Sequence, residues 1–171
     1  MFVMINGAFG IGKSTVAREL RALLPGSMIF DPEWIGIALQ RTAFRGVSDF
    51  QDLALWRRMT VLGARCVATP GTPVIIPMAF SRLEYLNEIR AGLAKSKRPV
   101  FHFCLTAPAE VVRQRLATRG EPAGDARWAW VHRRAMECCA VHRLPGFATQ
   151  VETRDRTAAA IAASIAAAVG N

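Results

Sequence analysis

The sequence is poor in acidic residues and very poor in lysine. It contains 13 Asp and Glu against 22 Lys and Arg in 171 residues, a formal net charge of +9, and its lysines are Lys13, Lys95 and Lys97. Arginine therefore supplies nearly all of the positive charge, and it is spread along the chain. Such a charge favours anionic partners, but the even spread argues against a nucleic-acid-binding protein.

Cysteine and long apolar runs are also scarce. The four cysteines form no C-x-x-C pair and no metal-ligand spacing, which favours a reducing, cytoplasmic setting. Cys66 and Cys104 lie in apolar runs and are expected to be small core residues. The most apolar segment, 157–169, would be about 20 Å long as a helix against the ~30 Å of a bilayer core. We expect it to pack on the protein, with weak peripheral membrane association as the alternative.

What the sequence does contain is a glycine loop. Residues 7–14 read G-A-F-G-I-G-K-S, which fits the phosphate-loop pattern G-x-x-x-x-G-K-[ST]. An apolar run before it predicts a strand, and apolar residues at helical spacing after it predict a helix. Converging backbone N–H groups and the helix dipole bind phosphate in such a loop. The loop therefore predicts an ATP site with Lys13 on the β- and γ-phosphates and Ser14 on Mg²⁺. The predicted ATP contacts in this segment are Gly7, Ala8, Phe9, Gly10, Ile11, Gly12, Lys13, Ser14 and Thr15.

Strand and helix patterns alternate along the rest of the chain. Strands are predicted at 2–6, 27–30, 73–77, 100–105 and 149–152. Helices are predicted at 13–24, 34–69 in two pieces, 83–94, 108–119 and 157–169, with one more that carries Trp128, Trp130 and Arg134. This order predicts an α/β fold in one domain, 1–171: a three-layer α/β/α P-loop NTPase with a five-stranded parallel sheet. Residues 34–69 are predicted to bind the acceptor, and 119–127 to form a lid loop.

Two signatures of other nucleotide-binding proteins are missing. The residues after the third predicted strand, 77–80, include no acid, so the usual Walker B aspartate is absent. The guanine signature N-K-x-D is absent as well. These absences argue against a motor and against a regulatory GTPase.

Asp31 directly follows the second predicted strand. Ligands in parallel sheets bind beyond the carboxyl ends of the strands, so we expect Asp31 one strand away from the phosphate loop. A carboxylate there can take a proton from an acceptor hydroxyl and help to hold Mg²⁺. Asp31 is therefore predicted as catalytic base and metal ligand, the alternative being an ordinary turn acid before Pro32.

The region after Asp31 mixes aromatic residues with arginines. Such a mixture suits a pocket for an acceptor that has both apolar and anionic parts, although aromatic residues at helical spacing are often core. The predicted acceptor contacts are Asp31, Trp34, Phe44, Phe50, Trp56 and Arg57, with Arg57 meeting an anionic group. Elsewhere, His102 lies inside a predicted strand and is expected to be a core histidine with satisfied nitrogens.

Arginines are grouped on the helix before the predicted lid. Arg115 and Arg119 lie four residues apart, on one helix face. Because a guanidinium can stack on adenine or bind phosphate oxygens, both are predicted to contact ATP and Arg119 to be catalytic. Arg127 and Arg134 are expected to approach when the lid closes.

Together these segments resemble the tunicamycin-resistance protein family. This family belongs to the small P-loop kinases, near chloramphenicol phosphotransferase, shikimate kinase and the nucleoside monophosphate kinases. The resemblance rests on Asn6–Lys13, Phe30–Glu33, Asp49–Gln51, Leu55–Arg57, Val74–Met78, Glu84-Tyr85, Asn87–Ile89, Arg115-Leu116, Arg119 and Trp128-Ala129. It implies ATP binding, tunicamycin resistance by phosphorylation or by binding alone, a base at Asp31 and lid arginines at Arg115 and Arg119. Residues 120–127 depart from the family pattern.

The resulting hypothesis is an ATP-dependent phosphotransferase that moves the γ-phosphoryl of MgATP to a hydroxyl of a small molecule, tunicamycin or a similar nucleoside-like compound. We expect a cytoplasmic monomer or homodimer. Two alternatives stay open: an ATP-binding protein that sequesters the drug without chemistry, and a nucleotide or metabolite kinase.

Overall fold

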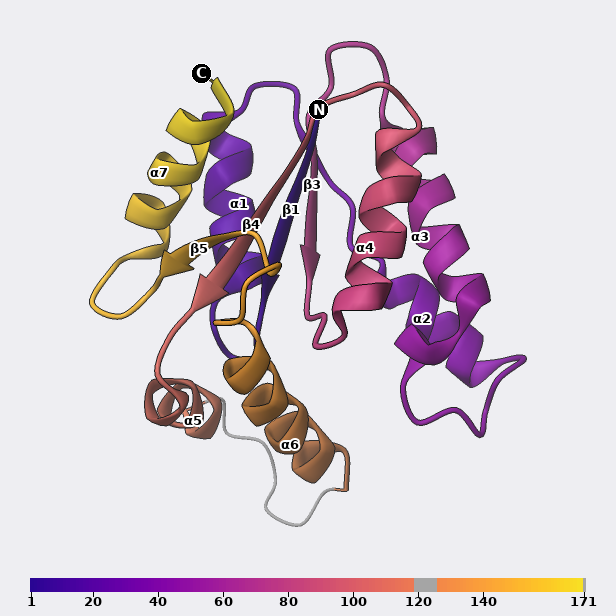
Figure 1. Cartoon of the computed structure of the whole chain (residues 1–171), viewed down its shortest axis with the longest axis vertical. Coiled ribbons are helices and arrows are strands. Elements are labelled where there is room, and N and C mark those ends of the chain that lie inside the picture. The colour runs from indigo at the N-terminus through magenta and orange to yellow at the C-terminus, as the bar shows by residue number, and fades with distance from the viewer. Residues whose placement is uncertain (119–125, 171) are drawn as a thin grey trace.

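The computed structural model describes residues 1–118 and 126–170, which form a five-stranded parallel sheet with helices on both faces (Figure 1). The strands are β1 (Phe2–Gly7), β2 (Met28–Ile29), β3 (Val74–Met78), β4 (Val100–Thr106) and β5 (Thr149–Glu152). The helices are α1 (Lys13–Leu23), α2 (Glu33–Arg41), the 3-10 turn η1 (Phe50–Asp52), α3 (Ala54–Val67), α4 (Leu83–Ala94), α5 (Ala109–Ala117), α6 (Ala126–Val141) and α7 (Ala158–Gly170). The predicted parallel α/β fold is confirmed.

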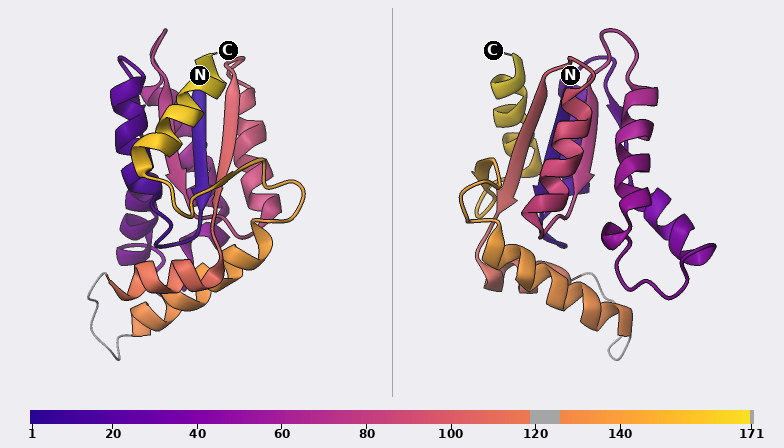
Figure 2. Two further views of the ribbon diagram at one scale, coloured as in Figure 1. Left: turned by 90° about the vertical axis from the view of Figure 1, so that its left-hand side faces the viewer. Right: turned by 45° about the vertical axis from the view of Figure 1, so that its right-hand side comes forward.

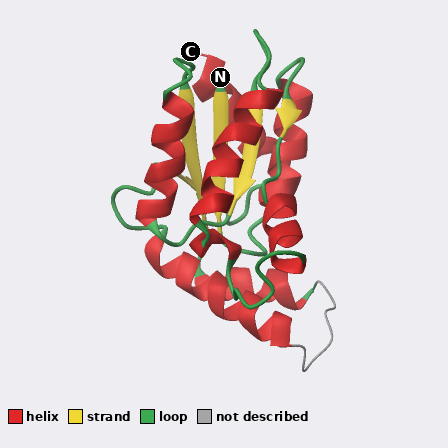
Figure 3. Cartoon of the chain, turned by 90° about the vertical axis from the view of Figure 1, so that its right-hand side faces the viewer, coloured by secondary structure: helices red, strands yellow, loops and turns green. Residues whose placement is uncertain are grey.

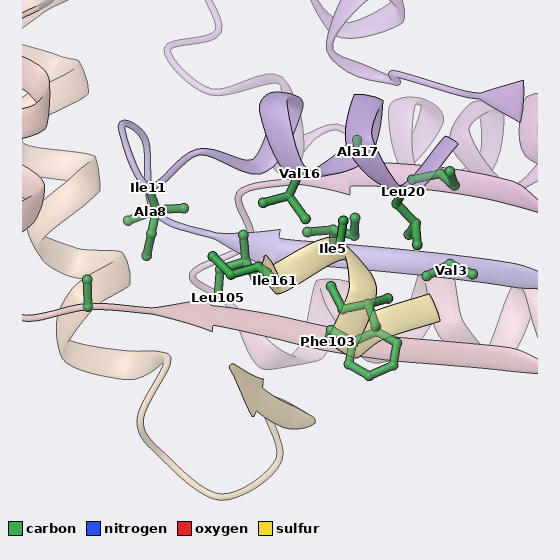
Figure 4. Packing of buried hydrophobic residues seen from close by; sticks show 14 of the residues in the cluster. Val3, Ile5, Ala8, Ile11, Val16, Ala17, Leu20, Phe103, Leu105 and Ile161 are labelled. Carbon is green, nitrogen blue, oxygen red and sulfur yellow. The ribbon is translucent and has the colours of Figure 1, made fainter. Parts of the chain in front are cut away.

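The strand order is β2-β3-β1-β4-β5, so β1 lies at the centre, between β3 and β4. All six residues of β1 are buried. Because side chains alternate along a strand, Val3 and Ile5 enter one core and Phe2 and Met4 the other. The first core lies against α1 and α7, where Leu20 and Ile161 close it (Figure 4). This two-sided burial explains why β1 reads as a continuous apolar run.

The second core lies between the sheet and α3 with α4 (Figure 1). Trp56 on α3 and Leu86 on α4 are both fully buried in it. Cys104 is in this core, as predicted, whereas Cys66 is exposed. The prediction for Cys66 is wrong because α3 buries the face that carries Trp56 and Ala64, and Cys66 lies on the other side of the helix.

His102 also departs from its prediction. It is buried on β4, at 7% exposure, yet neither ring nitrogen has a hydrogen-bond partner in the part of the chain that the structure describes. Burial, and next the charge of Arg90, lower the pKa of His102 to about 4. The ring is therefore neutral at pH 7.

The carboxyl ends of the strands are covered by α5 and α6. Figure 2 shows both helices running across that edge of the sheet, whereas the two chain termini lie at the opposite edge. Figure 3 shows the same division from the side of α3 and α4. Within the described residues, no helix combines the length and the apolar character needed to cross a membrane. Peripheral membrane association stays a prediction.

Candidate functional site

The phosphate loop joins β1 to α1 at the carboxyl ends of the strands, which α5 and α6 cover. Gly10 and Gly12 have φ values of 80° and 106°, which favour glycine. A Cβ added at Gly12 would meet no atom within 4 Å, whereas one at Gly10 would lie 2.8 Å from Cγ of Leu116. The loop is thus packed at Gly10 and open at Gly12, where α1 begins with no acid in its first turn. That open, positive helix start fits a bound phosphate.

Lys13 is buried beside this opening. Its Nζ donates a 2.9 Å hydrogen bond to the carbonyl of Ala8 and lies 5.3 Å from the centroid of the Phe9 ring. These contacts hold the ammonium across the loop, and its role on phosphate oxygens stays a prediction. Ser14 and Thr15 are exposed on the first turn of α1, within reach of a ligand.

Asn6 fixes the base of the loop. Its Oδ1 accepts a 2.8 Å hydrogen bond from the N–H of Phe80, and its Nδ2 donates to the carbonyl of Phe80 at 3.3 Å. Nε2 of His142 lies 2.5 Å from the same carbonyl. A carbonyl only accepts, so His142 carries its proton on Nε2. Burial lowers the pKa of His142 to about 4, which keeps the ring neutral. The ends of β1, β3 and α6 are thereby joined under the loop.

A pocket of about 200 Å³ opens on one side of the loop. It is lined by Gly10, Ile11, Gly12, Thr15, Val16, Arg115, Thr153, Arg156, Ala158 and Ile161. Arg115 joins its walls, because Nη1 donates to the carbonyl of Ile11 at 3.2 Å and Nη2 to that of Thr153 at 2.9 Å. The structure thus places Arg115 against the loop, where it was predicted to contact ATP.

A larger cavity of about 400 Å³ lies on the other side of the loop. It is lined by Phe9, Glu33, Ile37, Gln40, Arg41, Ser48, Asp49, Phe50, Trp130 and Val131. Phe9 comes from the phosphate loop itself and meets Trp130 of α6 edge to face, with ring centroids 5.7 Å apart. The volume and the mostly apolar wall are typical of a small-molecule site.

A buried ion pair crosses from this cavity to α6. Arg134 Nη2 lies 2.8 Å from Oδ2 of Asp49, and Nη1 lies 3.0 Å from Oε2 of Glu137. Oδ1 of Asp49 accepts a 2.9 Å hydrogen bond from the N–H of Gln51. Burial raises the pKa of Asp49, although Gln51 and Arg134 act in the opposite direction. Arg134, expected to approach the nucleotide when the lid closes, is thus paired with a residue that lines the larger cavity.

Asp31 lies at the end of β2, half-buried, and its Oδ1 accepts a 3.0 Å hydrogen bond from the N–H of Glu33. This bond is the turn role that the sequence allowed, and it starts α2. The expectation that Asp31 follows the strand next to β1 needs correction, because β3 lies between β2 and β1. Two strand spacings are about 10 Å. Asp31 is therefore separated from the loop by the end of β3.

Besides Asp31, four predicted acceptor contacts lie outside the cavity wall. Trp56 is fully buried, and its Nε1 donates a 2.9 Å hydrogen bond to the carbonyl of Pro32. Arg57 lies along α4, with Nε 2.6 Å from Oε2 of Glu88 and its guanidinium over Tyr85. Trp34 is 72% exposed, and Phe44 is half-buried elsewhere. The rotation of α3 explains two of these corrections, since it directs Trp56 into the core and Arg57 towards α4.

Phe50 does line the cavity, whereas Asp49, Gln40 and Trp130 were not predicted there. The sequence does show Asp49 as a single acid beside Phe50 in a turn. Its partner Arg134 is distant in the chain, so the sequence could not indicate the ion pair. Arg119 lies outside the described residues, as does the side chain of Arg127, so both assignments stay predictions.

The metal assignment stays a prediction as well. Among residues 1–118 and 126–170, no group of three or more His, Cys, Asp or Glu could hold a metal ion. The exposed hydroxyl of Ser14 and the carboxylate of Asp31 offer the oxygen ligands that Mg²⁺ prefers. An ion held by either of them would take its other ligands from phosphate and water.

Gly36 on α2 gives a test of the cavity wall. A Cβ at this position would collide with the ring of Phe50. Gly36→Ala is therefore expected to move Phe50 and to lower the free energy of unfolding by about 1–3 kcal/mol. Gly46→Ala, where a Cβ meets nothing within 4 Å, is the control and should change it by less than about 0.5 kcal/mol. Urea denaturation measures both, and equal values would contradict the packing described.

Comparison with known proteins places this site in context. The family model described as an AAA domain matches residues 2–138. The chain is similar to the tunicamycin resistance protein of Deinococcus radiodurans, with 31% sequence identity and a TM-score of 0.78 over 99% of this chain and 95% of that one. No curated protein sequence matches it significantly.

More distant structures share the fold alone. The APS kinase CysC of Mycobacterium tuberculosis, in complex with AMPPNP and APS, has a TM-score of 0.69 at 20% identity over 99% of this chain and 97% of that one. The shikimate kinase of Acinetobacter baumannii, in complex with shikimate, has a TM-score of 0.64 at 15% identity over 98% of this chain and 92% of that one.

Proposed function

Because this chain belongs to the AAA domain family of P-loop proteins, we propose that it is an ATP-dependent phosphotransferase acting on an alcohol group of a small molecule. One observation carries the proposal: the phosphate loop separates two pockets and contributes residues to both. Gly10, Ile11 and Gly12 line the smaller pocket, and Phe9 lines the larger one. A donor nucleotide and an acceptor bound there would meet at the loop, as phosphoryl transfer requires.

The residues around the loop divide the work of the reaction. MgATP supplies the γ-phosphoryl group that is transferred in line to the acceptor hydroxyl. Lys13 and the first amides of α1 bind its phosphate oxygens, and Ser14 with Asp31 would hold the ion. Asp31 accepts the proton that the hydroxyl loses. The contact between Phe9 and Trp130 would help to keep water from this side of the loop.

The proposed acceptor is tunicamycin or a related nucleoside-like compound. Support comes from the similarity over nearly the whole chain to a protein that is itself described as a tunicamycin resistance protein. The aromatic wall of Phe9, Phe50 and Trp130 suits a molecule with large apolar parts. Arg57 lies outside this wall, so Arg41 replaces it as the arginine available to an anionic group.

The nucleotide side can be tested at Arg115. Arg115→Gln is expected to raise the dissociation constant for MgATP about tenfold, because the charged bridge between Ile11 and Thr153 is lost. Isothermal titration calorimetry measures the change. Arg113→Gln, which removes an exposed arginine from the same helix, is the matched control. Similar losses in the two variants would show an effect of net charge and contradict the assigned position.

The reaction itself is tested by mass spectrometry. Purified protein with MgATP and tunicamycin should release ADP and increase the mass of the drug by one phosphoryl group, and Lys13→Ala should abolish both. A panel of nucleoside monophosphates and hydroxy acids, run in parallel, separates this function from that of a metabolite kinase. If ADP is released with one of those compounds and not with tunicamycin, the protein is a nucleotide or metabolite kinase.

A second candidate function is drug sequestration with ATP as a structural ligand. The observation that favours it is the end of β3, next to the loop, where Met78 to Phe80 include no acid. In that case tunicamycin should bind with ATP present and be recovered unchanged.

A further inference from the structure

A groove lies near the amino ends of the strands, at the end of the sheet opposite to the phosphate loop. It is lined by Asn87, Arg90, Ala91, Ala94, Arg98 and Val100 and has a volume of about 480 Å³. The first four follow helical spacing and form one face of α4, and Val100 is the first residue of β4. Figure 3 shows α4 beside the sheet at this place. None of the lining residues is acidic, so the two arginines face no carboxylate across the groove.

Arg98 lines this groove and has one N–H donor group without a hydrogen-bond partner in the described part of the chain. Its Nη2 donates a hydrogen bond to the carbonyl of Thr69, which fixes the guanidinium. Its Nη1 is buried and has no hydrogen-bond partner within the described residues. A buried donor without a partner is unfavourable, and its positive charge makes an anion the matching partner. Arg90 is half-buried and donates only a long bond, 3.4 Å, to Oδ1 of Asn87.

His102 gives a second, independent sign of a missing ligand. It is more than nine-tenths buried, and both ring nitrogens lack partners in residues 1–118 and 126–170. Because side chains alternate along β4, His102 points to the same face of the sheet as Val100, which lines the groove. Arg90 lies close enough to act on its charge state. The imidazole is not among the lining residues, but it lies behind them on the same face of the sheet, within electrostatic range of Arg90.

We propose that this groove binds a small phosphate-type oxyanion. Arg98 and Arg90 would donate charge-assisted hydrogen bonds to its oxygens, and the neutral ring of His102 would add one N–H donor. Guanidinium groups match the geometry of phosphate oxygens and can bind two of them at once. The site lies near the amino ends of the strands, and the proposal does not depend on the phosphotransferase function.

Nuclear magnetic resonance of the full chain tests the proposal. Inorganic phosphate is titrated at constant ionic strength, maintained with sodium chloride, while the imidazole signals of His102 are followed. We expect a saturable shift with a dissociation constant on the order of 1 mM, the range of a small polar site. Glycerol 3-phosphate, titrated separately, distinguishes a phosphomonoester ligand from free phosphate by which of the two binds more tightly. A linear or absent response with both compounds would overturn the proposal.

Variants identify the donors. Arg98→Gln and Arg90→Gln should each weaken the His102 response at least about tenfold, as expected for one lost charge-assisted contact. Lys95→Gln, which removes an exposed positive charge next to α4 but outside the groove, should leave it unchanged. The amide of Gly12 reports phosphate at the loop in the same spectra and shows that each variant is folded. An equal His102 shift in Arg98→Gln and in the unaltered protein would refute the site.

Discussion

Asp31→Asn is expected to lower the rate of phosphoryl transfer by about 10²–10⁴-fold, the usual contribution of a positioned acid or base. The amide cannot take the proton of the acceptor hydroxyl. Its oxygen can still accept the hydrogen bond from the N–H of Glu33, so α2 should begin unchanged. Single-turnover measurement with MgATP isolates the chemical step. Drug binding, measured by calorimetry, should stay within about twofold because Asp31 lies outside the lining of the acceptor cavity.

The control for this variant is Asp155→Asn. Asp155 is exposed and has a φ of 57°, a conformation that Asn tolerates well, so the same chemical change occurs away from the site. If Asp31→Asn abolishes transfer and cellular resistance together while the drug still binds, catalysis causes the resistance. If resistance survives unchanged, the protein acts by sequestration, and the role proposed for Asp31 is wrong.

Acidification is expected to destabilise the fold strongly through two buried histidines. His102 and His142 each have a pKa of about 4 in the folded chain, because burial opposes the charged ring. The ordinary value is about 6.5. For a pKa that folding depresses, the stabilisation is complete above pH 6.5 and is lost as the pH falls towards 4. Each shift corresponds to about 3 kcal/mol in the free energy of unfolding.

Urea denaturation between pH 7.5 and 4.5 measures this loss, and His102→Leu separates the two rings. His102 has no partner that the change would strand within the described residues, so this variant should lose about half of the pH dependence. His132→Leu on α6 is the control. Asp49 acts in the opposite direction, because its raised pKa favours the folded state at low pH. The comparison between variants cancels its effect, and an unchanged slope in His102→Leu would contradict the prediction.

Periodicity and turn residues were sufficient to predict the fold. The run at 2–6 matches β1, and the glycine loop with the helix from 13 matches the start of α1. Five strands that alternate with helices could hardly form anything but a parallel sheet, since crossover helices demand it. Local chemistry also indicated Lys13 and Arg115, which both lie against the loop. Each of these features depends on residues that are close together in the chain.

Predictions of side-chain position beyond the loop were less accurate. Trp56 and Phe50 have similar sequence surroundings, yet Trp56 is fully buried and Phe50 lines the cavity. The rotation of α3 against the sheet buries Trp56, whereas Phe50 lies on the separate turn η1. His102 was expected to have satisfied nitrogens, and the structure leaves both unpaired among the described residues. The sequence predicts that a histidine in an apolar strand is buried, but it does not predict which groups bind the ring nitrogens.

The sequence by itself thus predicted a phosphate-binding loop at residues 7–14, because backbone conformation at glycine and a helix start are local properties. Only the tertiary structure decided what surrounds that loop. The strand order inserted β3 between Asp31 and the loop, and the docking of α6 joined Arg134 to Asp49 and Trp130 to Phe9. Such contacts join residues far apart in the chain, so they depend on how whole elements pack and not on any local pattern.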